Sequence, residues 1–108
     1  MDENHLKTLK ILAGNPSVSQ RAVAQELNLS LGKANYLINA LVNKGYVKAR
    51  RFKNSHNKRA YLYVLTPLGI KKKLDLTFEF IKIKSEEFEI LKKEIETLKK
   101  DIQSVSPL

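Results

Sequence analysis

Residues 19–45 read SQRAVAQELNLSLGKANYLINALVNKG, and this stretch predicts two helices joined by a tight turn. Ser19 and Ser30 can each accept a hydrogen bond from the free N–H groups of a helix start, so both are expected to be N-caps. Asn28 tolerates left-handed backbone geometry and is expected to end the first helix, and Gly45 is expected to end the second. Two short helices separated by so few residues are typical of a helix-turn-helix.

A β-hairpin is predicted directly after this motif. Residues 46–52 and 61–65 are rich in β-forming side chains, and the polar segment KNSHNK at 53–58 separates them. Tyr61 and Tyr63 alternate on one strand face beside Leu and Val. This setting favours packing in a small core over an exposed surface that stacks RNA bases.

Further helices are predicted on both sides of these elements. Asp2 is expected to cap a first helix, so the order over residues 1–66 is helix, helix-turn-helix and hairpin, which is a mainly α winged helix. Thr66 and Pro67 predict the start of a last helix, with Thr as N-cap and Pro at the first position. Neither Pro nor Gly interrupts residues 70–106, so this helix can extend roughly 55 Å.

The last helix carries apolar side chains at heptad spacing. An isolated helix of this kind would expose them to water, so a partner is expected, and a second copy of the chain is the simplest one. Thr77 and Lys84 interrupt the first half of the stripe. Phe78, Phe80 and Ile83 lie off it and are expected to pack on the winged helix or on the partner, with a ligand pocket as the alternative. The predicted dimer interface contains Leu74, Phe78, Ile81, Phe88, Leu91, Ile95, Leu98 and Ile102.

The composition excludes several classes of protein. The chain has 108 residues, with 20 Lys or Arg against 11 Asp or Glu, and a formal net charge of +9, which favours a polyanionic partner. It contains no cysteine, which excludes a disulfide framework, a zinc finger and a thiol nucleophile. Two histidines far apart do not indicate a metal site, and no cofactor is expected. The sequence contains no nucleophile–base pair or phosphate-binding glycine loop, so it does not indicate an enzyme.

Charge is distributed unevenly along the chain. Residues 1–66 hold 11 Lys or Arg and 3 Asp or Glu, whereas residues 67–108 hold 9 and 8. This predicts a DNA-binding winged helix-turn-helix domain at 1–66 and a long dimerisation helix at 67–108. The polar start MDENHLK is unlike a signal peptide, and no apolar run approaches the roughly 20 residues that cross a bilayer. We therefore expect a cytoplasmic protein without a membrane partner.

The predicted helix at 30–44 has a polar side without an acidic residue. Solvated helix faces usually mix Glu with Lys, whereas amide, phenol and ammonium groups can bond to base edges in a major groove. Gly near the start of the helix allows the backbone to approach a phosphate closely. The expected DNA contacts of this helix are Ser30, Gly32, Lys33, Asn35, Tyr36 and Asn39.

The hairpin is strongly basic. From Lys48 to Arg59 there are six Lys or Arg, one His and no acid. Such charges repel each other unless phosphates neutralise them, although a solubilising loop is the alternative. Arg59 has a second open role, since it can brace the hairpin instead of binding DNA. The expected DNA contacts are Arg50, Arg51, Lys53, Asn54, His56, Lys58 and Arg59 in the wing. Contacts to the DNA backbone are expected from Ser19, Gln20 and Arg21 at the start of the second helix.

The runs SQRAVAQEL, SLGKANY, KGYVKARRFKNSHNK and YLYVLTPLG resemble MarR-type regulators, and most of all the small MarR-like regulators associated with exopolysaccharide gene clusters. The resemblance implies a bacterial homodimer in which Ser30, Lys33, Asn35 and Tyr36 form the base-reading stretch. Asn57 stands where MarR proteins have the Asp of an Asp-x-Arg brace, so that brace cannot form. The long N-terminal dimerisation helix is also missing, so control by phenolic ligands is not implied.

The function predicted from these observations is a sequence-specific transcriptional regulator, a dimeric repressor by the resemblance. Its helix at 30–44 is expected in the major groove of double-stranded DNA, with the wing at 50–59 on the backbone or in a minor groove. A nonspecific architectural DNA binder and a winged-helix protein adaptor remain alternatives. The operator, the regulated genes, any effector and the relative direction of the paired helices do not follow from the sequence.

Overall fold

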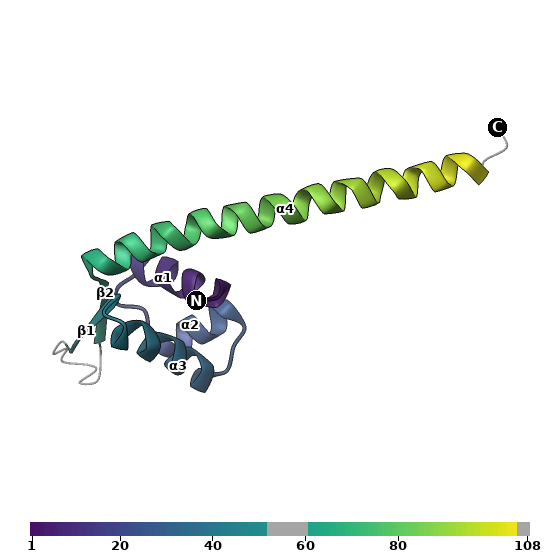
Figure 1. Cartoon of the computed structure of the whole chain (residues 1–108). Coiled ribbons are helices and arrows are strands. Elements are labelled where there is room, and N and C mark those ends of the chain that lie inside the picture. Colours follow the sequence, from purple (N-terminus) through teal and green to yellow (C-terminus); the bar gives the residue numbers. More distant parts are fainter. Residues whose placement is uncertain (52–60, 106–108) are drawn as a thin grey trace. The chain divides into compact units, whose positions relative to one another are not determined.

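A computed structural model of the chain describes residues 1–51 and 61–105, and these form four helices and a two-stranded hairpin (Figure 1). The mainly α winged-helix architecture predicted from the sequence is confirmed, with the long C-terminal helix. The elements are α1 (Glu3–Gly14), α2 (Gln20–Leu27), α3 (Leu31–Asn43), β1 (Val47–Arg51), β2 (Tyr61–Leu65) and α4 (Pro67–Val105).

The chain divides into two compact units, Met1–Thr77 and Phe78–Leu108. The distribution of charge along the sequence predicts a functional division at the start of α4, whereas the two compact units divide within that helix. The reason is that the first turns of α4 belong to the core of the first unit, where Gly69 is buried and Leu76 is only 1% exposed.

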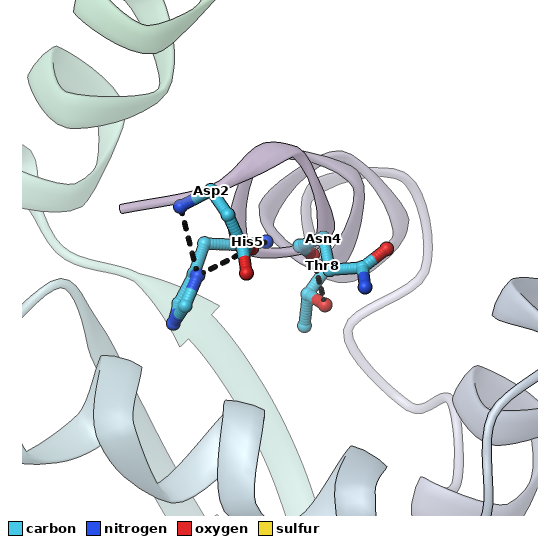
Figure 2. A network of polar contacts seen from close by, with 4 residues as sticks. All are labelled: Asp2, Asn4, His5 and Thr8. Carbon is cyan, nitrogen blue, oxygen red and sulfur yellow. Dashed lines mark hydrogen bonds and ion pairs between the residues drawn. The ribbon is translucent and has the colours of Figure 1, made fainter.

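Helix α1 begins with a capping box (Figure 2). The Asp2 carboxylate accepts a hydrogen bond of 3.1 Å from the backbone N–H of His5 and lies 2.7 Å from Nδ1 of the His5 ring. The Asp2 backbone N lies 3.2 Å from the same Nδ1, which completes the capping box. One turn further, the buried Thr8 hydroxyl donates to the carbonyl of Asn4 at 2.7 Å. The bond from the His5 N–H to Asp2 occupies a donor that a helix start leaves free, and it confirms the predicted Asp2 cap.

The connection between α2 and α3 has the predicted caps. The Ser19 hydroxyl accepts from the N–H of Ala22 at 3.0 Å, and the Ser30 hydroxyl accepts from the N–H of Lys33 at 3.1 Å. Asn28 adopts left-handed geometry at φ 55° and ψ 47°. A single left-handed residue reverses the chain without a glycine, so α3 follows α2 after three residues.

The hairpin is antiparallel and pairs Val47 with Leu65 and Ala49 with Tyr63. Its buried side chains are Val47 and Tyr63, as expected for strands that contact the core on one face. The Tyr63 backbone N–H donates to the carbonyl of Pro16 at 2.8 Å, so the segment between α1 and α2 lies against β2.

Gly45 ends α3 with φ +78°, a conformation that favours glycine.

The core of the first unit combines apolar side chains from all of its elements, and each fully buried leucine contributes about 2 kcal/mol. The buried apolar residues are Leu6, Leu9, Leu12, Val18, Val23, Ala24, Ala34, Leu37, Ile38, Leu41, Val47, Tyr63 and Leu76.

Candidate nucleic-acid interface

Helix α3 presents one polar side to solvent and one apolar side to the core. Ala34, Leu37, Ile38 and Leu41 are buried, so they fix the rotation of the helix about its axis. On the opposite side four exposed residues form what we call the polar face of α3, and no residue of α3 is acidic. The polar face consists of Lys33, Asn35, Tyr36 and Asn39, with Tyr36 69% exposed.

Two amides of the polar face are held against each other. The Nδ2 group of Asn39 donates to Oδ1 of Asn35, one helical turn away. This bond restrains both side chains, and it leaves the Nδ2 group of Asn35 and the Oδ1 atom of Asn39 facing solvent. Together the two side chains can present an amide donor from Asn35 and an amide acceptor from Asn39, which are groups that bond to base edges in the major groove.

The start of α3 combines a cap with an open glycine. The Ser30 hydroxyl already accepts a hydrogen bond from the Lys33 N–H, so in this structure it serves the helix. A Cβ atom added to Gly32 would meet no protein atom within 4 Å. Packing inside the protein therefore does not account for glycine at this position, which fits the predicted approach of a phosphate to the backbone.

The three residues predicted at the start of α2 have different surroundings. Ser19 is exposed but its hydroxyl caps the helix, and Arg21 is exposed. Gln20 is half-buried, and its side-chain amide donates to the Tyr63 hydroxyl at 3.1 Å. In this structure Gln20 thus joins α2 to the hairpin, which its sequence position did not indicate.

The described part of the wing is basic. Lys48, Arg50 and Arg51 are all exposed on β1, and no acidic residue occurs in β1 or β2. The remaining predicted wing contacts lie outside the described residues: Lys53, Asn54, His56, Lys58 and Arg59, together with the altered brace position Asn57.

Sequence reasoning predicted packing for both tyrosines of β2, and the structure separates them. Tyr63 is buried, whereas Tyr61 is 43% exposed, and their rings stack with centroids 6.2 Å apart. The bond from Gln20 was missed because nothing in the sequence pairs residues 43 positions apart. The buried hydroxyl of a core tyrosine was a usable signal, since such a group needs a partner.

The predicted dimer-interface residues all lie on α4, within both units. Leu74, Phe78 and every described residue from Ile81 to Val105 are exposed. Phe80, predicted to pack on the winged helix or on a partner, is half-buried. The described part of the second unit, residues 78–105, is therefore one helix whose apolar side chains are mostly exposed to solvent.

The described residues were also compared with the requirements of a metal site and of a membrane-spanning helix. Within residues 1–51 and 61–105, no group of three or more His, Asp or Glu side chains could hold a metal ion. Among the described helices, none combines the length and the apolar character needed to span a bilayer.

A groove of about 680 Å³ lies on the first unit and is lined mainly by apolar side chains, including Leu12, Val64 and Ile70.

Comparison with known proteins agrees with this geometry. Residues 1–48 match the family model described as winged helix-turn-helix DNA-binding. A mutant of MarR from E. coli has the same fold with a TM-score of 0.70, at 21% identity over 99% of this chain and 79% of that chain. The fold of the chain is therefore a winged helix-turn-helix similar to that of MarR.

Other solved structures share the MarR-type fold. The PcaV transcriptional regulator from Streptomyces coelicolor, in complex with its natural ligand, gives a TM-score of 0.73 at 16% identity, over 97% of this chain and 76% of its own. Streptococcus pneumoniae FabT in complex with DNA gives 0.60 at 21% identity, over 98% and 78%. No curated protein sequence matches the chain. The family model and these structures concern DNA-binding proteins and regulators rather than enzymes, in agreement with the sequence-based prediction.

Proposed function

We propose that this protein is a cytoplasmic, sequence-specific transcriptional regulator of MarR type that binds double-stranded DNA as a homodimer. Helix α3 enters the major groove, and the wing contacts the backbone or an adjacent minor groove. The observation that carries the proposal is the acid-free polar face of α3, held in a fixed orientation by the buried side chains behind it.

The chemistry of the polar face suits base reading. Asn35 and Asn39 offer amide donors and acceptors, Lys33 offers an ammonium group and Tyr36 offers a phenol. A B-DNA major groove is about 12 Å wide and admits one helix, and each base pair there displays its own donor and acceptor pattern. Exposed, restrained polar groups on a single helix can discriminate between such patterns.

The wing supplies charge rather than sequence readout. Lys48, Arg50 and Arg51 are exposed on β1, and the five further predicted wing residues belong to the same basic stretch of sequence. Basic side chains that neutralise phosphates release condensed counterions, so their contribution falls as salt rises. The wing is therefore proposed to set affinity and orientation on the duplex.

Dimerisation is proposed through α4, on its stripe Leu74, Phe78, Ile81, Phe88, Leu91, Ile95, Leu98 and Ile102. A symmetric dimer presents two copies of α3 to the duplex. If both copies read the same side of the DNA, the half-site centres lie about 34 Å apart, roughly one helical turn. Repression, and a link to exopolysaccharide genes, are proposed from the family resemblance alone.

Selection from random duplex DNA tests the proposal directly. The purified full chain is incubated with the pool at about 0.15 M salt, which screens contacts made by charge alone, and the bound sequences are determined. An enriched inverted repeat supports a sequence-specific dimer. Salt-sensitive binding without an enriched sequence would replace this proposal by a nonspecific architectural role, and absence of DNA binding would favour a protein adaptor.

A further inference from the structure

The second unit has a heptad pattern of apolar and charged side chains. This pattern indicates how many helices pair with it and whether they run parallel or antiparallel. When Ile81 is taken as position a, the a positions are Ile81, Phe88, Ile95 and Ile102. The d position at 84 is Lys, which interrupts the stripe, and from residue 91 onward the d positions are apolar, namely Leu91, Leu98 and Val105. From Ile81 to Ile102 these side chains are between 44% and 70% exposed. Together the a and d residues from Ile81 to Val105 form what we call the α4 seam.

The residue types in the seam favour two strands over three or four. Ile occupies three of the four a positions, and Leu occupies the d positions 91 and 98. In parallel coiled coils β-branched residues at a, combined with Leu at d, favour dimers over trimers and tetramers. The occupant indicated by the seam is therefore one further helix of the same kind.

The charges beside the seam are segregated by side. The g positions carry Glu87, Glu94 and Asp101, whereas the e positions 92 and 99 carry Lys. In a parallel dimer each g residue faces the e residue five positions later in the other helix. Glu87 then faces Lys92 of the second copy, and Glu94 faces Lys99 of the second copy, twice in each dimer.

An antiparallel pair would bring like charges together over the same segment. In that arrangement g residues face g residues and e residues face e residues. Within residues 87–101 the acidic side of one helix would meet the acidic side of the other, and the lysines would meet lysines. Like charges that face each other destabilise a helix pair, so the segregation of charge favours the parallel direction.

We propose that two copies of this chain pair through the α4 seam as a parallel, in-register, two-stranded coiled coil from Ile81 to Val105. This inference rests on the proposed dimer and adds its direction, its register and its ion pairs. Both winged-helix units then leave the same end of the coiled coil, which allows them to bind neighbouring half-sites. Glu89 and Lys93 lie at positions b and f, away from the partner.

Disulfide cross-linking tests whether the two α4 helices run parallel or antiparallel. Introduced cysteines can be interpreted directly because the chain contains no cysteine of its own. Leu91→Cys and Leu98→Cys are made separately in the full chain and oxidised. In a parallel pair both positions lie opposite their own copies, and both variants are expected to form covalent dimers. In an antiparallel pair, residues about 10 Å apart along the helix cannot both meet their own copies. Glu96→Cys, on the outer side, is the matched control and is expected to form no covalent dimer.

Charge reversal gives an independent test with the seam intact. The double variant Lys92→Glu and Lys99→Glu turns every g–e pair of the parallel dimer into an acid–acid pair. We expect the dimer dissociation constant to rise at least roughly tenfold at low salt, and less at high salt. Adding Glu87→Lys and Glu94→Lys restores opposite charges and is expected to restore dimerisation. An antiparallel dimer would be indifferent to the first double variant.

A further pair of variants checks the position of the seam. Leu91 and Ile90 are adjacent and similarly exposed, at 53% and 60%, but only Leu91 lies in the seam. Leu91→Ser is expected to dissociate the dimer, and Ile90→Ser to leave it intact.

The outcomes separate this inference from the proposed function. A monomer at micromolar concentration, measured by sedimentation, would overturn both the proposed dimer and the coiled coil. Cross-linking at only one of the two cysteine positions, or a dissociation constant unchanged by charge reversal, would overturn the parallel direction alone. Sequence-specific DNA binding is measured separately by the selection experiment and is not affected by those results.

Discussion

The side-chain amide of Gln20 donates a hydrogen bond of 3.1 Å to the hydroxyl of Tyr63 and so joins the first residue of α2 to the middle of β2. The Tyr63 backbone N–H adds a second link through the carbonyl of Pro16. One tyrosine of the hairpin is therefore bonded both to the helix-turn-helix and to the segment that precedes it. The basic strand β1, paired with β2, is held against the helices by the same contacts.

Removing the Tyr63 hydroxyl should lower stability without changing the fold. Tyr63→Phe leaves the half-buried Gln20 amide without its acceptor, and we expect the free energy of unfolding to fall by about 1 kcal/mol. Urea denaturation measures this change. Tyr61→Phe is the matched control, because Tyr61 is largely exposed and lies on the same strand face. Equal losses in both variants would show that the Gln20 bond has no specific role.

Gly32→Ala should separate stability from DNA binding. A Cβ at this position meets no protein atom, and replacing glycine within a helix by alanine gains up to about 1 kcal/mol. We therefore expect equal or greater stability together with weaker binding to the selected DNA, since the added methyl group blocks close approach of a phosphate. Gly14→Ala, at an equally open position at the end of α1, should leave binding unchanged. Wild-type affinity in the Gly32 variant would refute the predicted backbone approach.

Variants of the polar face and of the wing should affect different properties. Asn35→Ala and Tyr36→Ala are expected to reduce discrimination between the selected and a scrambled sequence, by about 1–3 kcal/mol for a lost base contact. Arg50→Ala should weaken both sequences similarly and reduce the salt slope by about 1. The same is expected of Lys53→Ala and Lys58→Ala. The roles assigned to helix and wing would be reversed if wing variants changed sequence preference and helix variants did not.

Gly69 should tolerate no side chain. A Cβ atom there would lie 1.8 Å from the carbonyl oxygen of Tyr46, and the obstructing atom belongs to the backbone. Gly69→Ala is therefore expected to destabilise the first unit by more than about 2 kcal/mol, as overpacked cores do. Thermal unfolding followed by circular dichroism measures this loss. Ile70→Ala, at the neighbouring and 59% exposed residue, is the control and should have a smaller effect.

The cap of α1 should make stability depend on pH in acid. Slight burial alone would raise the pKa of the Asp2 carboxyl, but hydrogen bonds from the His5 side chain and backbone outweigh it and lower the pKa below 3.8. A carboxyl with a lowered folded pKa stabilises the fold above its unfolded pKa, and this contribution is lost as pH falls from about 5 through the lowered value. Asp2→Asn keeps a capping oxygen that does not titrate.

Unfolding of both proteins at pH 7 and at pH 3 tests this prediction. The wild type should lose more stability than Asp2→Asn over that interval. Identical losses would mean that the Asp2 cap makes no pH-dependent contribution.

The sequence alone determined the order of the elements and most of their boundaries, because the signals are local. Ser19, Ser30 and Asp2 cap helices through bonds that span three residues, and Asn28 turns the chain through its own backbone preference. The polar face of α3 was also predictable, since helical periodicity places it opposite the buried side chains. The acid-free character of that face is likewise a property of composition.

Only the tertiary structure decided which side chains meet across the chain. Gln20 was expected at the DNA backbone, and its sequence neighbours contain nothing that identifies Tyr63 as its partner. Gly69 gave no local signal either, because its need for glycine arises from the carbonyl of Tyr46, which the fold brings against it. Such contacts depend on how helices and strands pack, and packing combines segments distant in sequence. Local propensity therefore fixed the elements of this protein, and tertiary packing decided how α2, the hairpin and the start of α4 are joined into one unit.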